Sequence, residues 1–147
     1  NRGTAYSDKG EYDHAIDDYN QAIQLNPKFA EAFNNRGNAY YKKGKYDRAI
    51  DDYNQAIQLN PKYALAFNNR GTAYSNKGEY DHSIADCNEA LKINPKFAIA
   101  FITRGEAYEL KGDKVKAIEN YRQALSVAQD FKVKELAQRK LKELEGK

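Results

Sequence analysis

The residue types that carry most enzyme chemistry are few in this chain and stand at unfavourable spacings. Of the 147 residues only two are histidines, His14 and His82, and they are 68 positions apart. Adjacent acids such as Asp17 and Asp18 point about 100° apart on a helix, which is poor geometry for sharing a metal ion. No phosphate-binding loop and no HExxH, GxSxG or CxxC motif is present. We therefore predict that the chain is not an enzyme and that it binds no cofactor and no metal.

Cys87 is the only cysteine. A disulfide framework is impossible with one thiol, and a single free thiol is typical of a cytoplasmic protein. No apolar run reaches the 18 residues that a membrane span needs, and no secretory leader is recognisable. These features predict a cytoplasmic protein with no membrane partner. Because the chain begins at Asn1 without Met, we expect that the natural protein continues upstream.

The net charge of +3 is unevenly distributed. Residues 132–147 hold six Lys or Arg against three Asp or Glu, whereas everything before Lys132 balances at eighteen against eighteen. Nucleic-acid binding needs clustered cations rather than mixed signs. The charge pattern therefore predicts that nucleic acid is not a partner.

A period of 34 residues organises the rest of the sequence. The stretch NNRGNAYYKKG at 34–44 returns as NNRGTAYSNKG at 68–78. Eight of the nine glycines occupy two slots of this period: Gly3, Gly37, Gly71 and Gly105, then Gly10, Gly44, Gly78 and Gly112. Such self-similarity indicates a repeat architecture, here with four units.

Each unit is predicted to fold as two helices. In the first, Phe33, Gly37 and Tyr40 recur at helical spacing, and Gly44 ends the run. The second carries an apolar stripe between residues 46 and 57, and Asn60-Pro61 stops it, because a residue before proline avoids the α region. No strand is predicted anywhere, so the fold class is all-α.

The repeated unit resembles the tetratricopeptide repeat (TPR). In repeat two the matching residues are Phe33, Gly37, Tyr40, Ala49, Tyr53, Ala56 and Pro61. Repeat three offers Phe67, Gly71, Tyr74, Ser83, Cys87, Ala90 and Pro95. The resemblance implies a right-handed superhelical solenoid of antiparallel helix pairs with a concave groove. It divides the chain into four units at 1–131, namely 1–29 (partial), 30–63, 64–97 and 98–131.

The two ends depart from the pattern. Residues 132–147 carry an apolar stripe with Lys and Glu elsewhere, which predicts a C-terminal capping helix over repeat four. Repeat one lacks the start of its first helix, so we expect an open N-terminal edge. Stacking of two copies through that edge would make a homo-oligomer.

An arginine projects with the packing face of each first helix. A guanidinium near a core needs a partner, because an unpaired buried charge costs several kcal/mol. Spacing favours Arg36 with Asp52, and by the same offset Arg70 with Asp86 and Arg2 with Asp18. Repeat four instead places Asn120 opposite Arg104. The alternative is that these arginines hold an acidic ligand.

Polar side chains are predicted to line the inner face of the first helices, where TPR proteins usually bind ligands. Primary amides donate and accept hydrogen bonds, which suits the backbone of an extended peptide. An asparagine ladder of this kind resembles the substrate-docking superhelix of certain sugar transferases. In repeat four, the carboxylate of Glu106 would favour a basic neighbour. The predicted peptide-binding residues are Asn1, Asn34, Asn35, Asn38, Tyr41, Asn68, Asn69, Thr72, Thr103 and Glu106.

The leading functional prediction is a protein-interaction scaffold that binds an extended peptide or a partner helix in its groove. Two alternatives remain open, a substrate-recruiting arm of a larger enzyme and a self-assembling repeat unit. Chaperone-adaptor TPR domains clamp a C-terminal carboxylate with cations, but Asn34, Ile99 and Thr103 stand at those slots here. We therefore expect that this class of partner is not bound.

Overall fold

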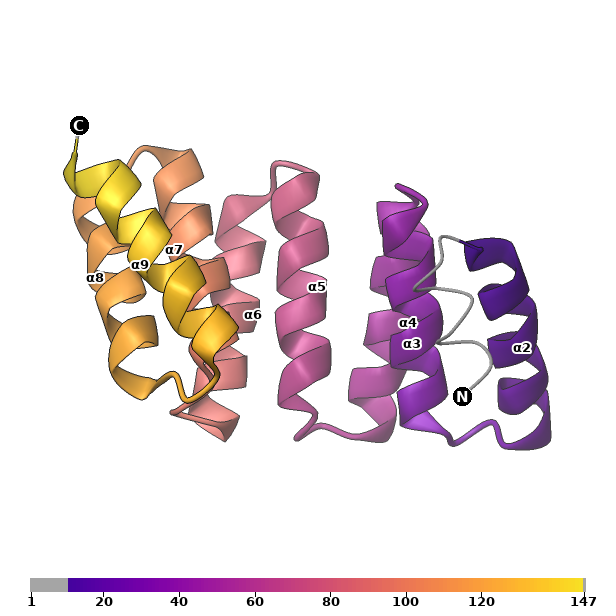
Figure 1. The fold of residues 1–147 in the computed structure, drawn as a ribbon. Coiled ribbons are helices and arrows are strands. Elements are labelled where there is room, and N and C mark those ends of the chain that lie inside the picture. Colours follow the sequence, from indigo (N-terminus) through magenta and orange to yellow (C-terminus); the bar gives the residue numbers. More distant parts are fainter. Residues whose placement is uncertain (1–10, 147) are drawn as a thin grey trace.

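The computed structural model describes residues 11–146, and the regular structure in this range is entirely helical (Figure 1). The prediction of an all-α fold is confirmed for this part of the chain. The helices are α2 (Tyr12–Leu25), α3 (Ala30–Lys42), α4 (Tyr46–Leu59), α5 (Ala64–Asn76), α6 (Tyr80–Ile93), α7 (Ala98–Lys111), α8 (Lys114–Val127) and α9 (Phe131–Glu145).

Tight turns fold α3 onto α4, α5 onto α6 and α7 onto α8. Each turn contains a glycine with a left-handed backbone: φ is +78° at Gly44, +83° at Gly78 and +90° at Gly112. Residues that carry a Cβ atom rarely adopt this backbone conformation. This explains why glycine recurs at this position of the repeat. The predicted end of the first helix at Gly44 is confirmed.

Close approach of the two helices in a hairpin depends on the other glycine slot. A Cβ atom at Gly37 would lie 2.7 Å from Cε1 of Tyr53, and one at Gly105 would lie 2.6 Å from Cε1 of Tyr121. Both tyrosines are at most 1% exposed. A large ring therefore packs directly against a glycine at both positions.

The connections between hairpins follow an Asn-Pro-Lys pattern. In the second connection α4 ends at Leu59, as the proline predicted, and the side-chain oxygen of Asn60 accepts a hydrogen bond from the backbone N–H of Lys62 at 3.1 Å. The same bond recurs at Asn26 and Asn94. These asparagines stabilise the turn, because a short side-chain acceptor replaces a backbone carbonyl there.

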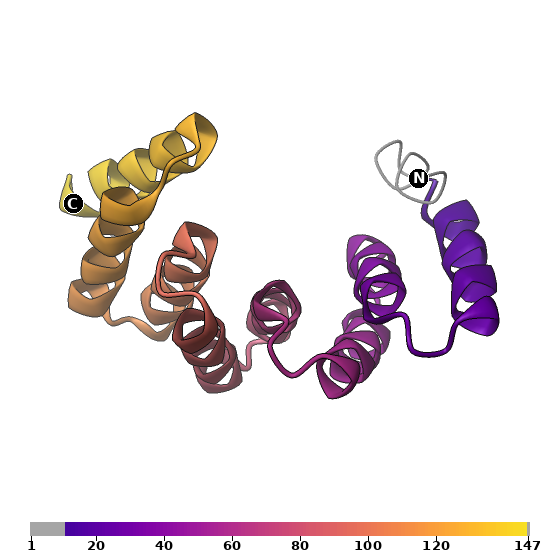
Figure 2. The same ribbon diagram turned by 90° about the horizontal axis from the view of Figure 1, so that it is seen from below.

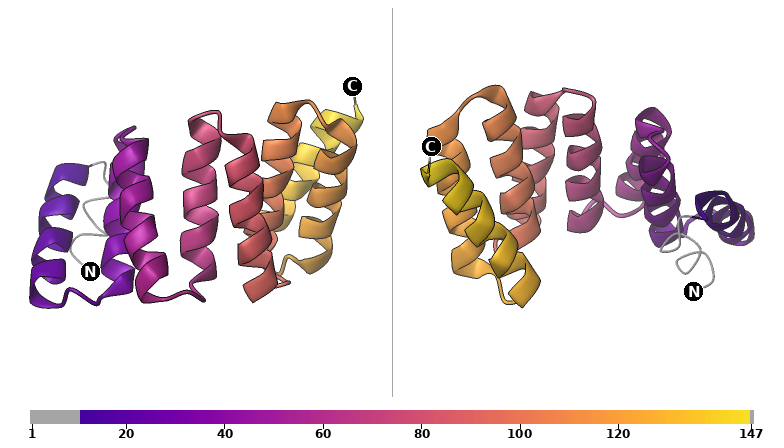
Figure 3. Two further views of the ribbon diagram at one scale, coloured as in Figure 1. Left: turned by 180° about the vertical axis from the view of Figure 1, so that it is seen from behind. Right: turned by 45° about the horizontal axis from the view of Figure 1, so that its top comes forward.

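Successive hairpins stack in chain order into an arch. Contacts join α2 to α3, α4 to α5 and α6 to α7, so each hairpin packs on the next, and Figure 3 shows the resulting row of helices. Seen along the helices, the row curves, with α3, α5 and α7 on the inner side and α4 and α6 on the outer side (Figure 2). We call the face formed by α3, α5 and α7 the concave face.

The C-terminal helix α9 packs mainly on α8 and closes the hydrophobic core of repeat four. Its buried residues are Ala137, Leu141 and Leu144. The side chain of Asp130 caps its first turn by accepting a hydrogen bond from the N–H of Lys132 at 2.7 Å. The helix predicted for 132–147 is therefore present and begins at Phe131. The predicted open N-terminal edge and the Arg2–Asp18 pair involve residues 1–10, which lie outside the described residues.

Candidate functional site

Paired arginines and aspartates join the two helices of each middle repeat. Arg36 donates from Nε and Nη2 to the two carboxylate oxygens of Asp52 at 2.8 and 2.7 Å. Arg70 and Asp86 repeat this two-bond geometry at 2.8 and 2.6 Å. The pairs predicted from spacing are confirmed, and these arginines hold acids of their own repeat.

The same guanidinium groups also tie each hairpin to the one before it. Nη1 of Arg70 donates to Oδ1 of Asn54 at 2.8 Å, and the ring of Phe67 lies 5.5 Å from its guanidinium carbon. Equivalent bonds join Arg36 to Asn20 and Arg104 to Asn88. In repeats two to four, one arginine therefore fixes both the hairpin and its register on the preceding repeat.

Burial and hydrogen bonding act in opposite directions on these pairs. Loss of water raises the pKa of the Asp52 and Asp86 carboxyls above the ordinary value, and the arginine bonds only partly oppose that effect. The same bonds raise the pKa of Arg36 and Arg70. Because desolvation offsets much of the attraction, the pairs specify geometry more than they add stability.

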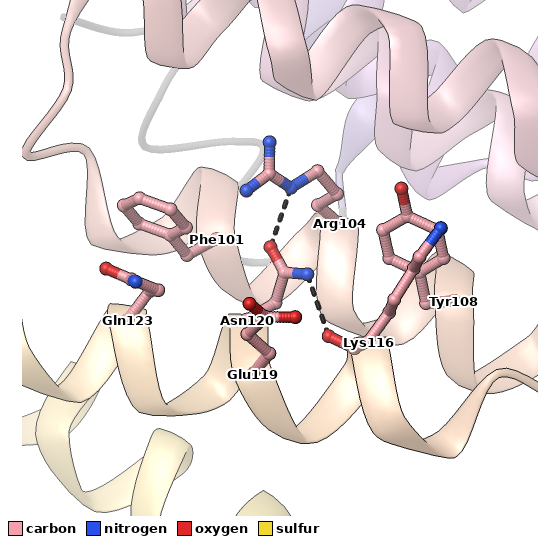
Figure 4. A pocket seen from close by; sticks show the side chains of 7 residues that line it. All are labelled: Phe101, Arg104, Tyr108, Lys116, Glu119, Asn120 and Gln123. Carbon is pink, nitrogen blue, oxygen red and sulfur yellow. Dashed lines mark hydrogen bonds between the residues drawn. The ribbon is translucent and has the colours of Figure 1, made fainter.

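Repeat four breaks this series. Arg104 donates from Nε to Oδ1 of Asn120 at 2.6 Å, and Nδ2 of Asn120 donates to the backbone oxygen of Lys116 at 2.8 Å (Figure 4). The predicted Arg104–Asn120 contact is confirmed. A neutral amide stands here where all three earlier repeats have an aspartate in the sequence.

A second ladder of ion pairs was missed by the sequence analysis. In repeats two to four, a lysine at the end of the first helix bonds an aspartate of the preceding repeat. Lys77 contacts Asp47 and Lys111 contacts Asp81, each at 2.5 Å. Lys43 pairs with Asp13 in the same way. The constant 30-residue offset was the available signal, and at Val115 the aspartate slot of this ladder is apolar.

Three predicted ligand-binding residues are buried, so the expectation that their side chains line an open surface is wrong. Asn34 is 1%, Asn68 3% and Thr103 7% exposed. Oδ1 of Asn34 accepts a hydrogen bond from Nδ2 of Asn69 at 3.0 Å, and the hydroxyl of Thr103 donates to the backbone oxygen of Ile99 at 3.1 Å. Contact with the next hairpin, as between Asn34 and Asn69, is an effect that a single-helix projection does not include.

Other predicted residues belong to the first helices α3, α5 and α7 and have partly exposed side chains. They are Asn35, Asn38, Tyr41, Asn69, Thr72 and Glu106. Several already have internal partners. Asn38 accepts from the hydroxyl of Tyr53 at 2.6 Å, and the hydroxyl of Tyr41 accepts from Nδ2 of Asn76 at 2.9 Å. Asn1 lies outside the described residues.

Glu106 has a basic neighbour within the chain itself. Nζ of Lys140 on α9 lies 2.9 Å from its carboxylate, and Arg122 on α8 pairs with Glu145 on α9 at 2.5 Å. The capping helix is thus held by charge as well as by apolar packing. It also places a lysine beside Glu106 of α7.

Three residues of reactive types, His14, His82 and Cys87, lie in the described range. His14 and His82 are exposed on separate hairpins. Cys87 is fully buried, and that burial raises the pKa of its thiol to about 12, which keeps it protonated. Residues 11–146 contain no group of three or more His, Cys, Asp or Glu that could hold a metal ion. In the same range no helix combines the length and apolar character needed to cross a bilayer.

Stacked helix hairpins that repeat every 34 residues define a helical-repeat solenoid. Family models of the TPR repeat match residues 3–44 and 37–78, and tetratricopeptide repeat models match 64–97 and 98–131. The chain belongs to the tetratricopeptide repeat family. No curated protein matches it in a sequence comparison.

Solved structures share this architecture. The crystal structure of MamA protein is 33% identical over 84% of this chain and 68% of its own, with a TM-score of 0.75. The first TPR of Spaghetti (RPAP3), bound to the HSP90 peptide SRMEEVD, is 28% identical over 80% and 90%, with a TM-score of 0.71. The Arabidopsis OM64 TPR domain is 29% identical over 78% and 94%, with a TM-score of 0.70.

Proposed function

We propose that this chain is a protein-interaction scaffold that binds an extended peptide or a partner helix on its concave face. The observation that carries the proposal is the set of partly exposed polar side chains on α3, α5 and α7, which are Asn35, Asn38, Tyr41, Asn69, Thr72 and Glu106. Such groups recognise a peptide backbone through both donors and acceptors.

Preorganisation supports this function. Cross-repeat bonds such as Asn69 to Asn34 and Asn76 to Tyr41 fix the spacing between first helices before any ligand arrives. A rigid surface loses little conformational entropy on association, so more of the contact energy contributes to affinity. No catalytic step is part of the proposal.

The structural relative bound to an HSP90 peptide supports peptide binding as a class. Three of the last four residues of that peptide are acidic. This chain has Asn34, Ile99 and Thr103 at the slots where such adaptors are expected to carry cations. Asn34 and Thr103 are also buried. The ligand of the concave face is therefore of a different chemical class from a C-terminal carboxylate.

A peptide array followed by titration of the purified chain tests the proposal. The variant Asn35→Ala/Asn69→Ala removes two concave amides, and Gln21→Ala/Gln55→Ala removes two exposed amides from α2 and α4 as the matched control. Loss of one or two peptide hydrogen bonds predicts about tenfold weaker binding for the first variant and unchanged binding for the control. Equal affinities for both variants would contradict the assignment of the ligand to the concave face.

A further inference from the structure

A pocket of about 440 Å³ opens between α7 and α8 in repeat four. Phe101 and Arg104 of α7 line it together with Lys116, Glu119 and Asn120 of α8, and Figure 4 shows these side chains around the opening. The six concave-face residues named above do not take part in its lining. The pocket is thus separate from the proposed peptide site.

Arg104 has unused hydrogen-bonding capacity at this pocket. Its Nε and Nη1 donate to the side-chain oxygens of Asn120 and Asn88. In the two preceding repeats Nη2 of the arginine donates to the aspartate, but Nη2 of Arg104 has no hydrogen-bond partner within residues 11–146. Asn120 does not provide one, because its Nδ2 is a donor and is committed to the Lys116 carbonyl.

The charges around the pocket are also unbalanced. Arg104 and Lys116 face only one acid, Glu119. At the corresponding slots repeat two has two arginines and two aspartates, Arg36 and Arg48 with Asp51 and Asp52. At the same four slots repeat three has Arg70 and Asp86, together with the uncharged residues His82 and Ala85. Only repeat four, among the three described hairpins with such an arginine, carries a surplus of one positive charge.

We propose that this pocket binds a carboxylate group presented by an acidic side chain of a partner polypeptide. A guanidinium is planar and matches a carboxylate with paired N–H donors, and Lys116 adds a second cation. One surplus positive charge fits a carboxylate monoanion better than a phosphate dianion, because the repulsion from Glu119 is about twice as large for a dianion as for a monoanion. The ring of Phe101, 5.4 Å from the guanidinium carbon of Arg104, supplies an apolar wall for the methylene groups of a glutamate.

Titration by NMR or calorimetry in low-salt buffer tests the site with two blocked peptides, Gly-Glu-Ala-Glu-Gly and its Gln counterpart. We expect the Glu peptide to bind and the Gln peptide not to bind. Asn120→Asp supplies the carboxylate that earlier repeats have, so it occupies Nη2 and cancels the surplus charge. We expect about tenfold weaker binding for this variant, equivalent to one charge-assisted hydrogen bond. The control variant Gln24→Glu adds the same negative charge at an exposed position of α2, far from the pocket. We expect it to leave peptide binding unchanged.

Two further probes separate the sources of the anion. Displacement of the Glu peptide by an equal concentration of glutarate would support the carboxylate site and would show that a free dicarboxylate also binds there. Tighter binding of inorganic phosphate than of the peptide overturns the proposal, as does equal binding of the Gln peptide or undiminished binding by Asn120→Asp. The variant Asn35→Ala/Asn69→Ala should still bind the Glu peptide at the pocket. The failure of the pocket proposal can therefore be distinguished from the failure of the concave-face proposal.

Discussion

Removal of Arg70 is expected to destabilise the chain more than removal of Arg104. Truncation at Arg70 leaves Asp86, which is 5% exposed, without its counter-charge. Breaking a buried ion pair in this way costs about 3–5 kcal/mol. Because the Arg70 side chain is 20% exposed and water reaches the guanidinium, the lower end, about 3 kcal/mol, is expected.

Arg104→Ala is the matched control, because its partners Asn120 and Asn88 are neutral. Each lost bond to a neutral amide costs about 0.5–1.5 kcal/mol, and no charge is stranded. Both arginines stack on a phenylalanine at nearly the same distance, 5.5 and 5.4 Å, so that contribution cancels in the comparison. The bond to the preceding hairpin, at Asn54 or Asn88, is lost in both variants and cancels too. The comparison therefore sets about 3 kcal/mol for the stranded carboxylate against about 0.5–1.5 kcal/mol for one amide bond, so Arg70→Ala is expected to lose about 1.5–2.5 kcal/mol more than Arg104→Ala.

Urea denaturation followed by circular dichroism measures both losses, and hydrogen exchange shows whether repeat three unfolds separately, as repeat arrays can. The variant Asp86→Asn provides a third loss in the free energy of unfolding for comparison. It converts repeat three to the arrangement of repeat four and should cost less than Arg70→Ala, because burial already raises the pKa of the Asp86 carboxyl and disfavours its charge. Equal losses in the two arginine variants would refute the reasoning.

Two other perturbations have defined outcomes. Gly37→Ala should destabilise the chain by about 1–2 kcal/mol in thermal melts, since the new Cβ would lie 2.7 Å from Tyr53. Gly71→Ala should cost less, because the nearest neighbour of its Cβ would be 3.2 Å away. A larger loss for Gly71→Ala than for Gly37→Ala would contradict the packing argument. Lys111 lowers the pKa of Asp81, so the stability from this pair is complete above the ordinary Asp value of about 4 and is lost as pH falls through the lowered value. The difference in urea midpoint between wild type and Lys111→Gln should therefore shrink below pH 4, and a constant difference would argue against the ion pair.

The fold was predictable because its determinants are local and repeated. Gly44, with its left-handed backbone, and the Asn60-Pro61 stop act within a few residues, so their effect is readable from one copy of the repeat. The Arg36–Asp52 pair was also predictable, since both residues belong to one hairpin whose geometry the periodicity defines.

The candidate site was less predictable because neighbouring hairpins decide which side chains stay accessible. Asn34 and Asn35 are adjacent in sequence, yet Asn34 is buried against Asn69 of the next repeat and Asn35 is partly exposed. The pairing of Glu106 with Lys140 depends on how the capping helix docks, which no repeat template contains. Both effects are long-range packing and lie beyond a single-helix projection.

The lysine–aspartate ladder gives the stack a direction. Repeats one to three present an acid to the next repeat, and repeats two to four present a lysine to the previous one. A middle hairpin docked in the reverse order would bring like charges together. At Val115 the acid is missing and at position 122 an arginine replaces the asparagine of earlier repeats. An engineer who wished to lengthen the array beyond repeat four would have to restore both residues before a further unit could dock.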